Sequence, residues 1–340
     1  MELGIDSFAS IFPRDGVAIA PVQRMADLLE EITVADQAGL HAFGVGEHHR
    51  AEFIDSAPAV ILAAAAARTR TIRLQSAVTV LGAADPVRVF QDYATLDLIS
   101  GGRAEIVAGR GSSVEAYPLF GHRLEDRDAL YEEKLLLLLA LRSEPYPHWT
   151  GRFRPSLQGQ GVFPRSVQAE LPVWVGVGGT PASFTRAGVL GLPLMVAIIG
   201  GEFRRFRPLV DLYRDAGHQA GVPLARLKVG VHAVGFIAET TDAAKAAFYP
   251  GWHDMWSKLG RERGWPYPTE TQFDDLCAPD GPYLIGDPAT VVAKLKRLSD
   301  DLGGVSRVNL QMSSASGDHI AMLRAIELMG TVIAPLVACK

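Results

Sequence analysis

Residues 171–188, LPVWVGVGGTPASFTRAG, have the pattern of one strand–turn–helix unit. The apolar run 173–175 is rich in β-forming side chains and predicts a buried parallel strand. Thr180 suits the N-cap of the helix that follows, and Pro181 suits its first position. Between strand and helix lie Gly178 and Gly179, and glycines ahead of a helix N-terminus leave backbone N–H groups free to bind an anion. The stretch therefore predicts either a phosphate-binding turn or a tight turn whose glycines serve the backbone alone.

This unit recurs along the whole chain. We expect strands at 2–8, 42–46, 72–80, 104–108, 173–177, 194–198, 228–237 and 307–311. We expect helices at 22–38, 58–68, 86–99, 125–142, 181–188, 202–217, 241–248, 288–301 and 318–336. Eight such units predict an α/β fold, a closed (β/α)8 TIM barrel with insertions, rather than an open sheet. No linker rich in proline, glycine or serine divides residues 1–340, so we expect a single domain.

Two stretches are too long for simple turns, and we expect them to be insertions in the barrel. Residues 143–170 include Trp149-Thr150-Gly151-Arg152 and predict a small hairpin. Residues 249–283 carry Trp252, Trp256 and Trp265 and predict a lid beside the last strands.

The composition is that of an ordinary globular protein, with 48% hydrophobic and 21% charged residues. A formal net charge of −5 without a basic run argues against nucleic acid as a partner. Cys277 and Cys339 lie far apart, without metal-type spacing, and suit a reducing compartment. Residues 1–6 read as a strand rather than a secretion signal, and the apolar runs 63–67 and 135–139 are too short to span a bilayer. We therefore expect a cytoplasmic protein that does not enter a membrane.

The second expected strand ends in Glu47-His48-His49. In a barrel of this kind, the active site lies where the strands end. Neighbouring side chains of a strand point to opposite faces, so either His48 alone or Glu47 with His49 faces the site. A metal ion would need two more ligands, and the other strand ends carry no matching set, so we expect no metal. The histidines then act as a proton donor or polar pocket wall, or they are hydrogen-bonded loop residues.

Arg110 follows the fourth expected strand, between Gly109 and Gly111. An arginine placed there suits bidentate contact with a phosphate or carboxylate group, and the alternative is a surface salt bridge. The third expected strand carries no titratable side chain near its end, so any role of that strand lies in its shape.

Together, these strand ends resemble the bacterial luciferase-like flavin monooxygenase superfamily. The resemblance rests on Glu47-His48-His49, on SAVTVLGAADPVRVFQDYATLDLISGGRAEIVAGRG at 76–111, on PLFG at 118–121 and on VWVGVGGTPAS at 173–183. It covers nearly the whole chain. The resemblance implies a (β/α)8 barrel with insertions that binds reduced FMN, or in one branch the deazaflavin F420, where the strands end.

The resemblance also assigns roles to individual residues. His48 falls on the catalytic histidine, and Ala77 and Val78 fall on a non-prolyl cis peptide beneath the flavin ring. The positions that hold the flavin phosphate correspond to Arg110 and Thr180, with Gly178 and Gly179 offering backbone N–H groups.

This chain departs from luciferase itself at several positions. Gly109 stands in place of a reactive cysteine, Asp128 in place of a second phosphate-binding arginine, and Gly176 and Val177 in place of polar residues. The departures bear on light emission and on long-chain aldehyde chemistry more than on flavin binding. Arg123 or Arg127 would be the substitute for the missing arginine.

The resemblance therefore implies an FMN-dependent monooxygenase or oxidoreductase that acts on a small organic substrate with O2. The chain has no nicotinamide-binding fingerprint, so we expect a separate flavin reductase to supply reduced FMN. We expect a homodimer, paired through the alanine-rich helix 58–68.

Three alternatives remain open. An F420-dependent dehydrogenase or reductase would use Arg152, Arg154 and Arg165 to hold the acidic tail of that cofactor. The others are a flavin-binding protein without catalysis and a metal-dependent hydrolase.

Overall fold

The fold is built around a ring of parallel strands. The computed structural model describes residues 1–12, 19–111, 113–315 and 317–338, so Cys339 lies outside the described residues. The ring contains eight strands, in the order β1, β2, β3, β5, β8, β9, β10 and β12. It closes because β10 pairs with β9 on one side and β12 on the other, while β12 also pairs with β1. The expected (β/α)8 barrel is confirmed. The ring strands are Glu2–Ser7 (β1), Ala42–Val45 (β2), Arg73–Ser76 (β3), Ala104–Gly109 (β5), Val173–Val177 (β8), Leu194–Ile198 (β9), Val229–Ile237 (β10) and Arg307–Gln311 (β12).

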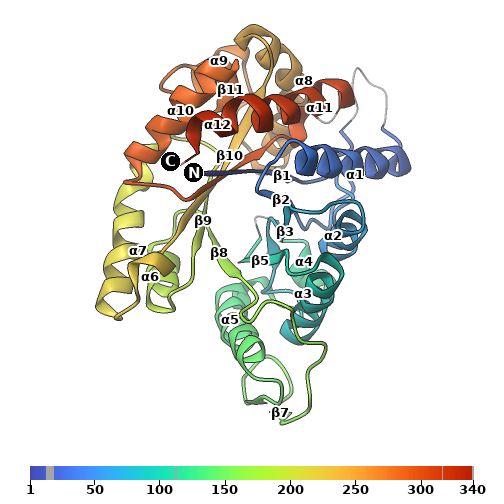
Figure 1. The fold of residues 1–340 in the computed structure, drawn as a ribbon, viewed down its shortest axis with the longest axis vertical. Helices are drawn as coiled ribbons and strands as arrows, with labels where there is room; N and C mark the ends of the chain where they lie inside the picture. The colour runs from blue at the N-terminus through green and yellow to red at the C-terminus, as the bar shows by residue number, and fades with distance from the viewer. Residues whose placement is uncertain (13–18, 112, 316, 339–340) are drawn as a thin grey trace.

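Helices surround this ring (Figure 1). Five of them, α1, α2, α3, α6 and α10, begin with a proline. Asp85 and Asp287 cap their helices, each accepting a hydrogen bond from a backbone N–H of the first turn. The helices are Pro21–Gln37 (α1), Pro58–Ala66 (α2), Pro86–Ser100 (α3), Ala116–Leu119 (α4), Arg127–Ser143 (α5), Pro181–Val189 (α6), Arg207–Gln219 (α7), Thr241–Arg263 (α8), Glu270–Cys277 (α9), Pro288–Asp301 (α10), His319–Leu328 (α11) and Ala334–Val337 (α12).

The sequence-based strand assignment is wrong at two places. The strand expected at 72–80 is divided into β3 and a short β4, Thr79–Val80, and the peptide bond Ala77–Val78 between them is cis. Strand β11, Leu284–Gly286, was not expected and pairs with β10 outside the ring. With three residues it is too short to show a hydrophobic period.

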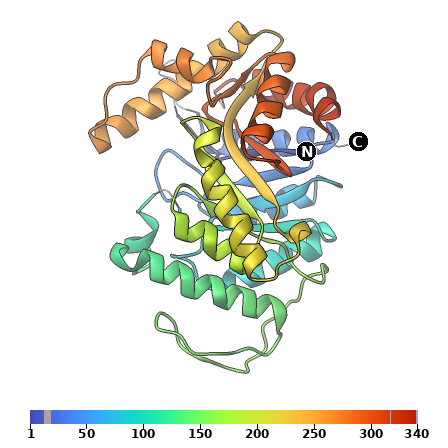
Figure 2. The same cartoon turned by 90° about the vertical axis from the view of Figure 1, so that its left-hand side faces the viewer.

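Both expected insertions are present, at opposite ends of the molecule. The expected hairpin in 143–170 is confirmed: His148–Trp149 (β6) pairs antiparallel with Leu157–Gln158 (β7) at the bottom of Figures 1 and 2. At the top left of Figure 2 lie α8 and α9, which form most of the second insertion.

The helix expected at 241–248 does not end there, because α8 continues through Pro250 to Arg263. A proline inside a helix normally breaks it, and that rule predicted the wrong end. Phe248 and Trp252 on either side of the proline are buried in an aromatic cluster with Phe273 of α9. This tertiary packing holds the helix together across the proline.

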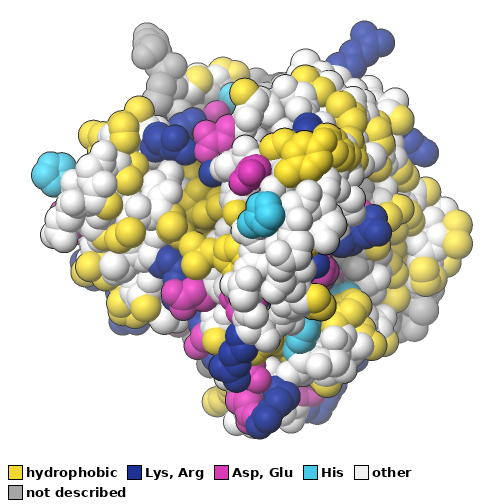
Figure 3. Space-filling model, turned by 90° about the horizontal axis from the view of Figure 1, so that it is seen from below, with side chains coloured by type: hydrophobic (Ala, Val, Ile, Leu, Met, Phe, Trp, Pro, Cys, Tyr) yellow, Lys and Arg dark blue, Asp and Glu magenta, His cyan; other side chains and the backbone are white. Residues whose placement is uncertain are grey.

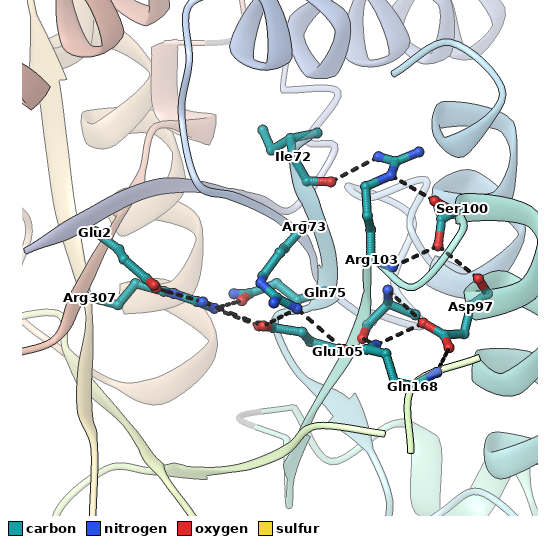
Figure 4. A network of polar contacts seen from close by, with 11 residues as sticks. Glu2, Ile72, Arg73, Gln75, Asp97, Ser100, Arg103, Glu105, Gln168 and Arg307 are labelled. Atoms are coloured by element: carbon teal, nitrogen blue, oxygen red, sulfur yellow. Dashed lines mark hydrogen bonds and ion pairs between the residues drawn. The ribbon is translucent and has the colours of Figure 1, made fainter. Parts of the chain in front are cut away.

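Polar side chains fill the barrel near the N-terminal ends of the strands (Figure 4). Arg307 of β12 donates to Glu105 of β5 at 2.5 Å, to Gln75 of β3 at 3.0 Å and to Glu2 of β1 at 2.7 Å. Side chains from four strands can meet in this way only inside the ring. The network closes this end of the barrel, and the opposite end, where the strands finish, is called the mouth below.

The C-terminal helical run His319–Val337 contains α11, a π-helical turn at Met329–Ile333 and α12. Its length and apolar composition alone would allow it to cross a membrane. One face of the run is buried in the protein core, including Met322, Ile326 and Ile333, as in a core helix of a globular protein.

Charges of both signs are interspersed on the face of the molecule shown in Figure 3. Lysine and arginine side chains alternate there with aspartate and glutamate. That face presents no field of a single sign of the kind that nucleic acid binding requires.

Candidate active site at the barrel mouth

His48 follows β2 and is held by a buried carboxylate. Its Nδ1 atom lies 2.9 Å from Oδ2 of Asp55, and its backbone N–H donates to Oδ1 of the same residue at 3.1 Å. The imidazole stacks on Phe53, with ring centroids 4.4 Å apart. Burial raises the pKa of the Asp55 carboxyl, and the hydrogen bond from His48 opposes that shift. With Nδ1 engaged, Nε2 is the ring nitrogen left to meet a ligand.

Glu47 and His49 form a separate pair beside His48. Nε2 of His49 lies 3.2 Å from Oε1 of Glu47, whose Oε2 accepts the backbone N–H of Val80 at 2.8 Å. The hydrogen bond to Glu47 raises the pKa of His49. Glu47 and His49 thus lie together and His48 lies apart from them, as the alternation of side chains predicts. Among the described residues, no group of histidine, cysteine and carboxylate side chains is placed to hold a metal ion.

The expected cis peptide at Ala77–Val78 is confirmed, and the Val78 side chain is received by two glycines. A Cβ atom on Gly109 would lie 2.5 Å from Cγ2 of Val78, and one on Gly176 would lie 2.8 Å from Cγ1. Contacts this short do not occur between real atoms, so any larger residue at either position would displace Val78. These two departures from luciferase therefore make room for Val78.

Arg110 and Thr180 are brought together from the ends of β5 and β8. Nη2 of Arg110 donates to the Thr180 hydroxyl at 3.1 Å, and Nη1 lies 2.5 Å from Oδ1 of Asp128. Thr180 occupies the N-cap position of α6, but its side chain does not cap the helix. Open space surrounds Gly178 and Gly179, where an added Cβ would meet no atom within 4 Å.

The structure contains features that support both interpretations of Arg110, as a phosphate contact and as a surface salt bridge. A cation, a hydroxyl group and a helix N-terminus with open space before it suit a phosphate group. The salt bridge to Asp128 is also present, and it lowers the pKa of that carboxyl through the Arg110 hydrogen bond. Two arginines were expected as substitutes for the missing phosphate-binding arginine. Nε of Arg127 lies 3.8 Å from Oδ1 of Asp128, whereas Arg123 pairs with Glu125.

Helix α8 is tied to the loop that carries His48. Nη2 of Arg50 lies 2.7 Å from Oε1 of Glu262, and its Nη1 lies 2.7 Å from Oε1 of Glu115. Lys258, also on α8, pairs with Glu52. The second insertion therefore spans from the end of β10 to the loop after β2.

A cavity of about 570 Å³ lies between the end of β9 and the second insertion. Trp252, Trp256 and Trp265 line it on one side, and Ile199 and Gly200 on the other. No site residue predicted from the sequence lines this cavity. The three tryptophans thus line a cavity that is separate from the site residues predicted from the sequence.

Sequence reasoning missed two polar residues of the mouth. The sequence contains a weak indication of Asp55, because this residue lies seven positions after His48 on the same loop. Nothing in the sequence indicates His232, which lies in the middle of a buried strand. Only the closed ring brings it to Asp6.

The family model described as luciferase-like monooxygenase matches residues 1–305. Among curated proteins, 4-hydroxyprotoasukamycin monooxygenase from Streptomyces nodosus subsp. asukaensis is 26% identical over 88% of this chain and 83% of its own length. The 3,6-diketocamphane 1,6-monooxygenase of Pseudomonas putida is 22% identical over 88% of this chain and 90% of its own length. Matches to two uncharacterized proteins of Sinorhizobium fredii, at 36% and 27% identity, cover only 37% and 58% of those proteins.

Solved structures share the fold over the whole chain. Monooxygenase RslO1 from Streptomyces bottropensis has a TM-score of 0.86 and 22% identity, covering 99% of this chain and all of its own. The oxygenating constituent of 3,6-diketocamphane monooxygenase from Pseudomonas putida, in complex with FMN, has a TM-score of 0.79 and 19% identity, covering 100% and 99%. An F420-dependent secondary alcohol dehydrogenase has a TM-score of 0.75 and 16% identity, covering 99% of each chain.

Proposed function

Because the chain belongs to the luciferase-like monooxygenase family, we propose that it uses reduced FMN and O2 to oxygenate a small organic molecule. The observation that carries the proposal is the meeting of Arg110, Thr180 and the 178–179 turn at the mouth. Val78 packs against Gly109 and Gly176, which lie one residue before Arg110 and two residues before Gly178. This proximity supports the assignment of a phosphate anchor and a ring support to one site.

Each of these residues has a distinct task in the proposal. The Arg110 guanidinium, the Thr180 hydroxyl and the backbone N–H groups of Gly178 and Gly179 bind the phosphate. The cis peptide at Ala77–Val78 supports the flavin ring. When bound, the flavin supplies the electrons and the reaction with O2. His48 accepts or delivers a proton at Nε2, and Asp55 keeps its ring oriented.

We propose that a separate flavin reductase supplies the reduced flavin. One structural neighbour is itself named as the oxygenating constituent of a monooxygenase, which supports such a division of labour. We also propose a cytoplasmic location, in keeping with the buried free thiol of Cys277. Helix α2 presents Val60, 70% exposed, beside its alanines, and we propose that this face pairs two copies in a homodimer.

A structural neighbour that uses F420 supports the F420-dependent alternative. Of the three arginines of this chain that would hold the acidic tail of F420, one is already engaged. Arg165 donates to the carbonyl oxygens of Leu141 at 2.7 Å and Arg142 at 2.6 Å. Arg154 pairs with Asp85 and donates to the carbonyl oxygen of Pro155, and Arg152 pairs with Asp126. Loss of Arg165 from the expected set supports FMN over a cofactor with an acidic tail.

Titration of the purified protein with FMN, riboflavin and F420, followed by flavin absorption, tests the proposal. We expect saturable FMN binding, with riboflavin at least about tenfold weaker because it lacks the phosphate. Tighter binding of F420 would favour the dehydrogenase, and no binding of any flavin would contradict both. A protein that binds FMN without changing the reaction of reduced FMN with O2 would be a flavin carrier rather than an enzyme.

A further inference from the structure

Three side chains from three other strands meet around Asp6 of β1 inside the barrel. Oδ2 of Asp6 on β1 lies 2.7 Å from Nδ1 of His232 on β10. Oδ1 accepts from the amides of Asn309 on β12, at 2.9 Å, and Gln75 on β3, at 3.3 Å. Because β10 and β3 lie on opposite sides of β1 in the ring, these contacts cross the barrel interior. Asp6 is 1% exposed, and donors from three sides hold it as an acceptor.

His232 repeats the geometry of His48. In each residue, Nδ1 faces a buried carboxylate, Asp6 for His232 and Asp55 for His48. The two imidazoles lie against the same ring: the Phe8 centroid is 4.7 Å from that of His48 and 5.7 Å from that of His232. Within the described parts of the chain, neither Nε2 atom has a hydrogen-bond partner. Two oriented imidazoles thus flank one aromatic side chain at the mouth.

His232 is not fully enclosed although it lies within the ring. Its side chain keeps 9% of its surface exposed. The strands beside it offer Ala197 of β9 and Asn309 of β12, which carry no charge. The next charges, Arg307 with Glu105 and Glu2, lie toward the closed end and are paired with one another. Asp6 is therefore the acidic side chain in direct contact with His232.

We infer that His232 is a second proton-carrying residue of this site, positioned by Asp6 and separated from His48 by Phe8. This inference rests on the proposed function. When reduced FMN reacts with O2 without a substrate, FMNH⁻ + O2 + H⁺ gives FMN + H2O2, so two electrons pass to oxygen and a proton is taken up. In its imidazolium form His232 carries a proton on Nε2 as well as on Nδ1. Transfer of the Nε2 proton to the reduced oxygen would leave the neutral Nδ1–H ring, and water would then return a proton to Nε2. Asp6, which lies 2.7 Å from Nδ1, keeps the ring oriented throughout.

Reoxidation of reduced FMN by dissolved O2, followed by flavin absorption across a range of pH, tests the inference without knowledge of the substrate. In His232→Gln, we expect the rate on the enzyme to fall about 100-fold or more. FMN affinity should stay within a few-fold. Asp6→Asn should lower the rate as well, because an amide no longer fixes the Nδ1–H form of the ring. The matched control is His218→Gln, on the exposed surface of α7, which should leave rate and pH profile unchanged.

Chemical rescue distinguishes a proton-carrying role of His232 from a merely structural one. Imidazole added to His232→Gly should restore reoxidation, whereas it should do nothing for the wild type. Unchanged rates and pH profile in His232→Gln would overturn the inference, and so would failure of imidazole to rescue a folded His232→Gly protein that binds FMN. If the wild type itself neither binds FMN nor alters reoxidation, the proposed function fails first, and this inference fails with it.

Discussion

Nδ1 of His48 lies 2.9 Å from Oδ2 of Asp55, whose other oxygen accepts the backbone N–H of the same histidine. One buried carboxylate therefore fixes both the position and the ring orientation of His48. Orientation of this kind assigns the Nδ1–H tautomer and directs Nε2 toward the mouth.

His48→Ala should cut turnover by about 10²- to 10⁴-fold, which is the usual contribution of general acid–base catalysis. FMN affinity should stay within a few-fold, because the phosphate-binding residues are untouched. His49→Ala is the matched control and should do less, since its ring is turned to Glu47. Steady-state kinetics and FMN titration check this. Loss of FMN binding in His48→Ala, or a larger effect of His49→Ala, would show that the roles are assigned wrongly.

Arg110→Ala should weaken FMN binding by about 10- to 150-fold, because charge-assisted hydrogen bonds contribute about 1.5–3 kcal/mol. Riboflavin binding should barely change. Isothermal titration with both ligands checks this, and an equal loss for both would mean that Arg110 does not contact the phosphate.

Asp128→Asn should have the opposite effect on FMN. Asp128 holds Arg110 in a salt bridge and places a negative charge beside the expected phosphate. Its removal should tighten FMN binding by about two- to fivefold, as expected for an exposed charge pair. The effect should shrink at high salt, because screening weakens such pairs. Weaker FMN binding in this variant would place the phosphate away from Arg110.

Gly109→Ala should lower the free energy of unfolding by about 1–3 kcal/mol, as overpacking does, because the new methyl group would collide with Val78. Val78→Ala in the same protein removes the colliding methyl groups and should restore part of the loss. Gly178→Ala is the control, because open space surrounds it and stability should change by less than about 0.5 kcal/mol. Urea unfolding measures all three. A Gly109→Ala protein of unchanged stability would contradict the close contact.

His319 should make stability depend on pH. Its Nε2 lies 2.9 Å from Oε2 of Glu30, joining α11 to α1, and the carboxylates of Glu31 and Glu30 raise the pKa of His319 to about 9. A histidine whose pKa is higher in the folded state stabilises the fold fully below its ordinary pKa of 6.5 and no longer above about 9. The difference in unfolding free energy between wild type and His319→Gln should therefore be largest below pH 6.5 and vanish above pH 9. A difference independent of pH would show that the ion pair is absent.

The sequence alone determined the architecture, because each βα unit is specified locally. The signals that specify such a unit act over a few residues, and the structure agrees with them. They include apolar strands such as 173–177, capping residues before proline such as Asp85 and Asp287, and the alternation of Glu47, His48 and His49. The resemblance carried by residues 76–111 added the cis bond at Ala77–Val78, which no local rule requires.

Only the tertiary structure decided which side chains meet. Asp6 and His232 are 226 residues apart, and the closed ring alone makes them neighbours. Asp128 forms its salt bridge with Arg110 because α5 packs beside the end of β5. Helix α8 continues past Pro250, against its local propensity, because Phe248 and Trp252 are buried. Local periodicity indicates which face of a helix or strand is buried. It does not indicate which residue that face contacts across the core. Those contacts set the ionisation and orientation of the groups at the mouth.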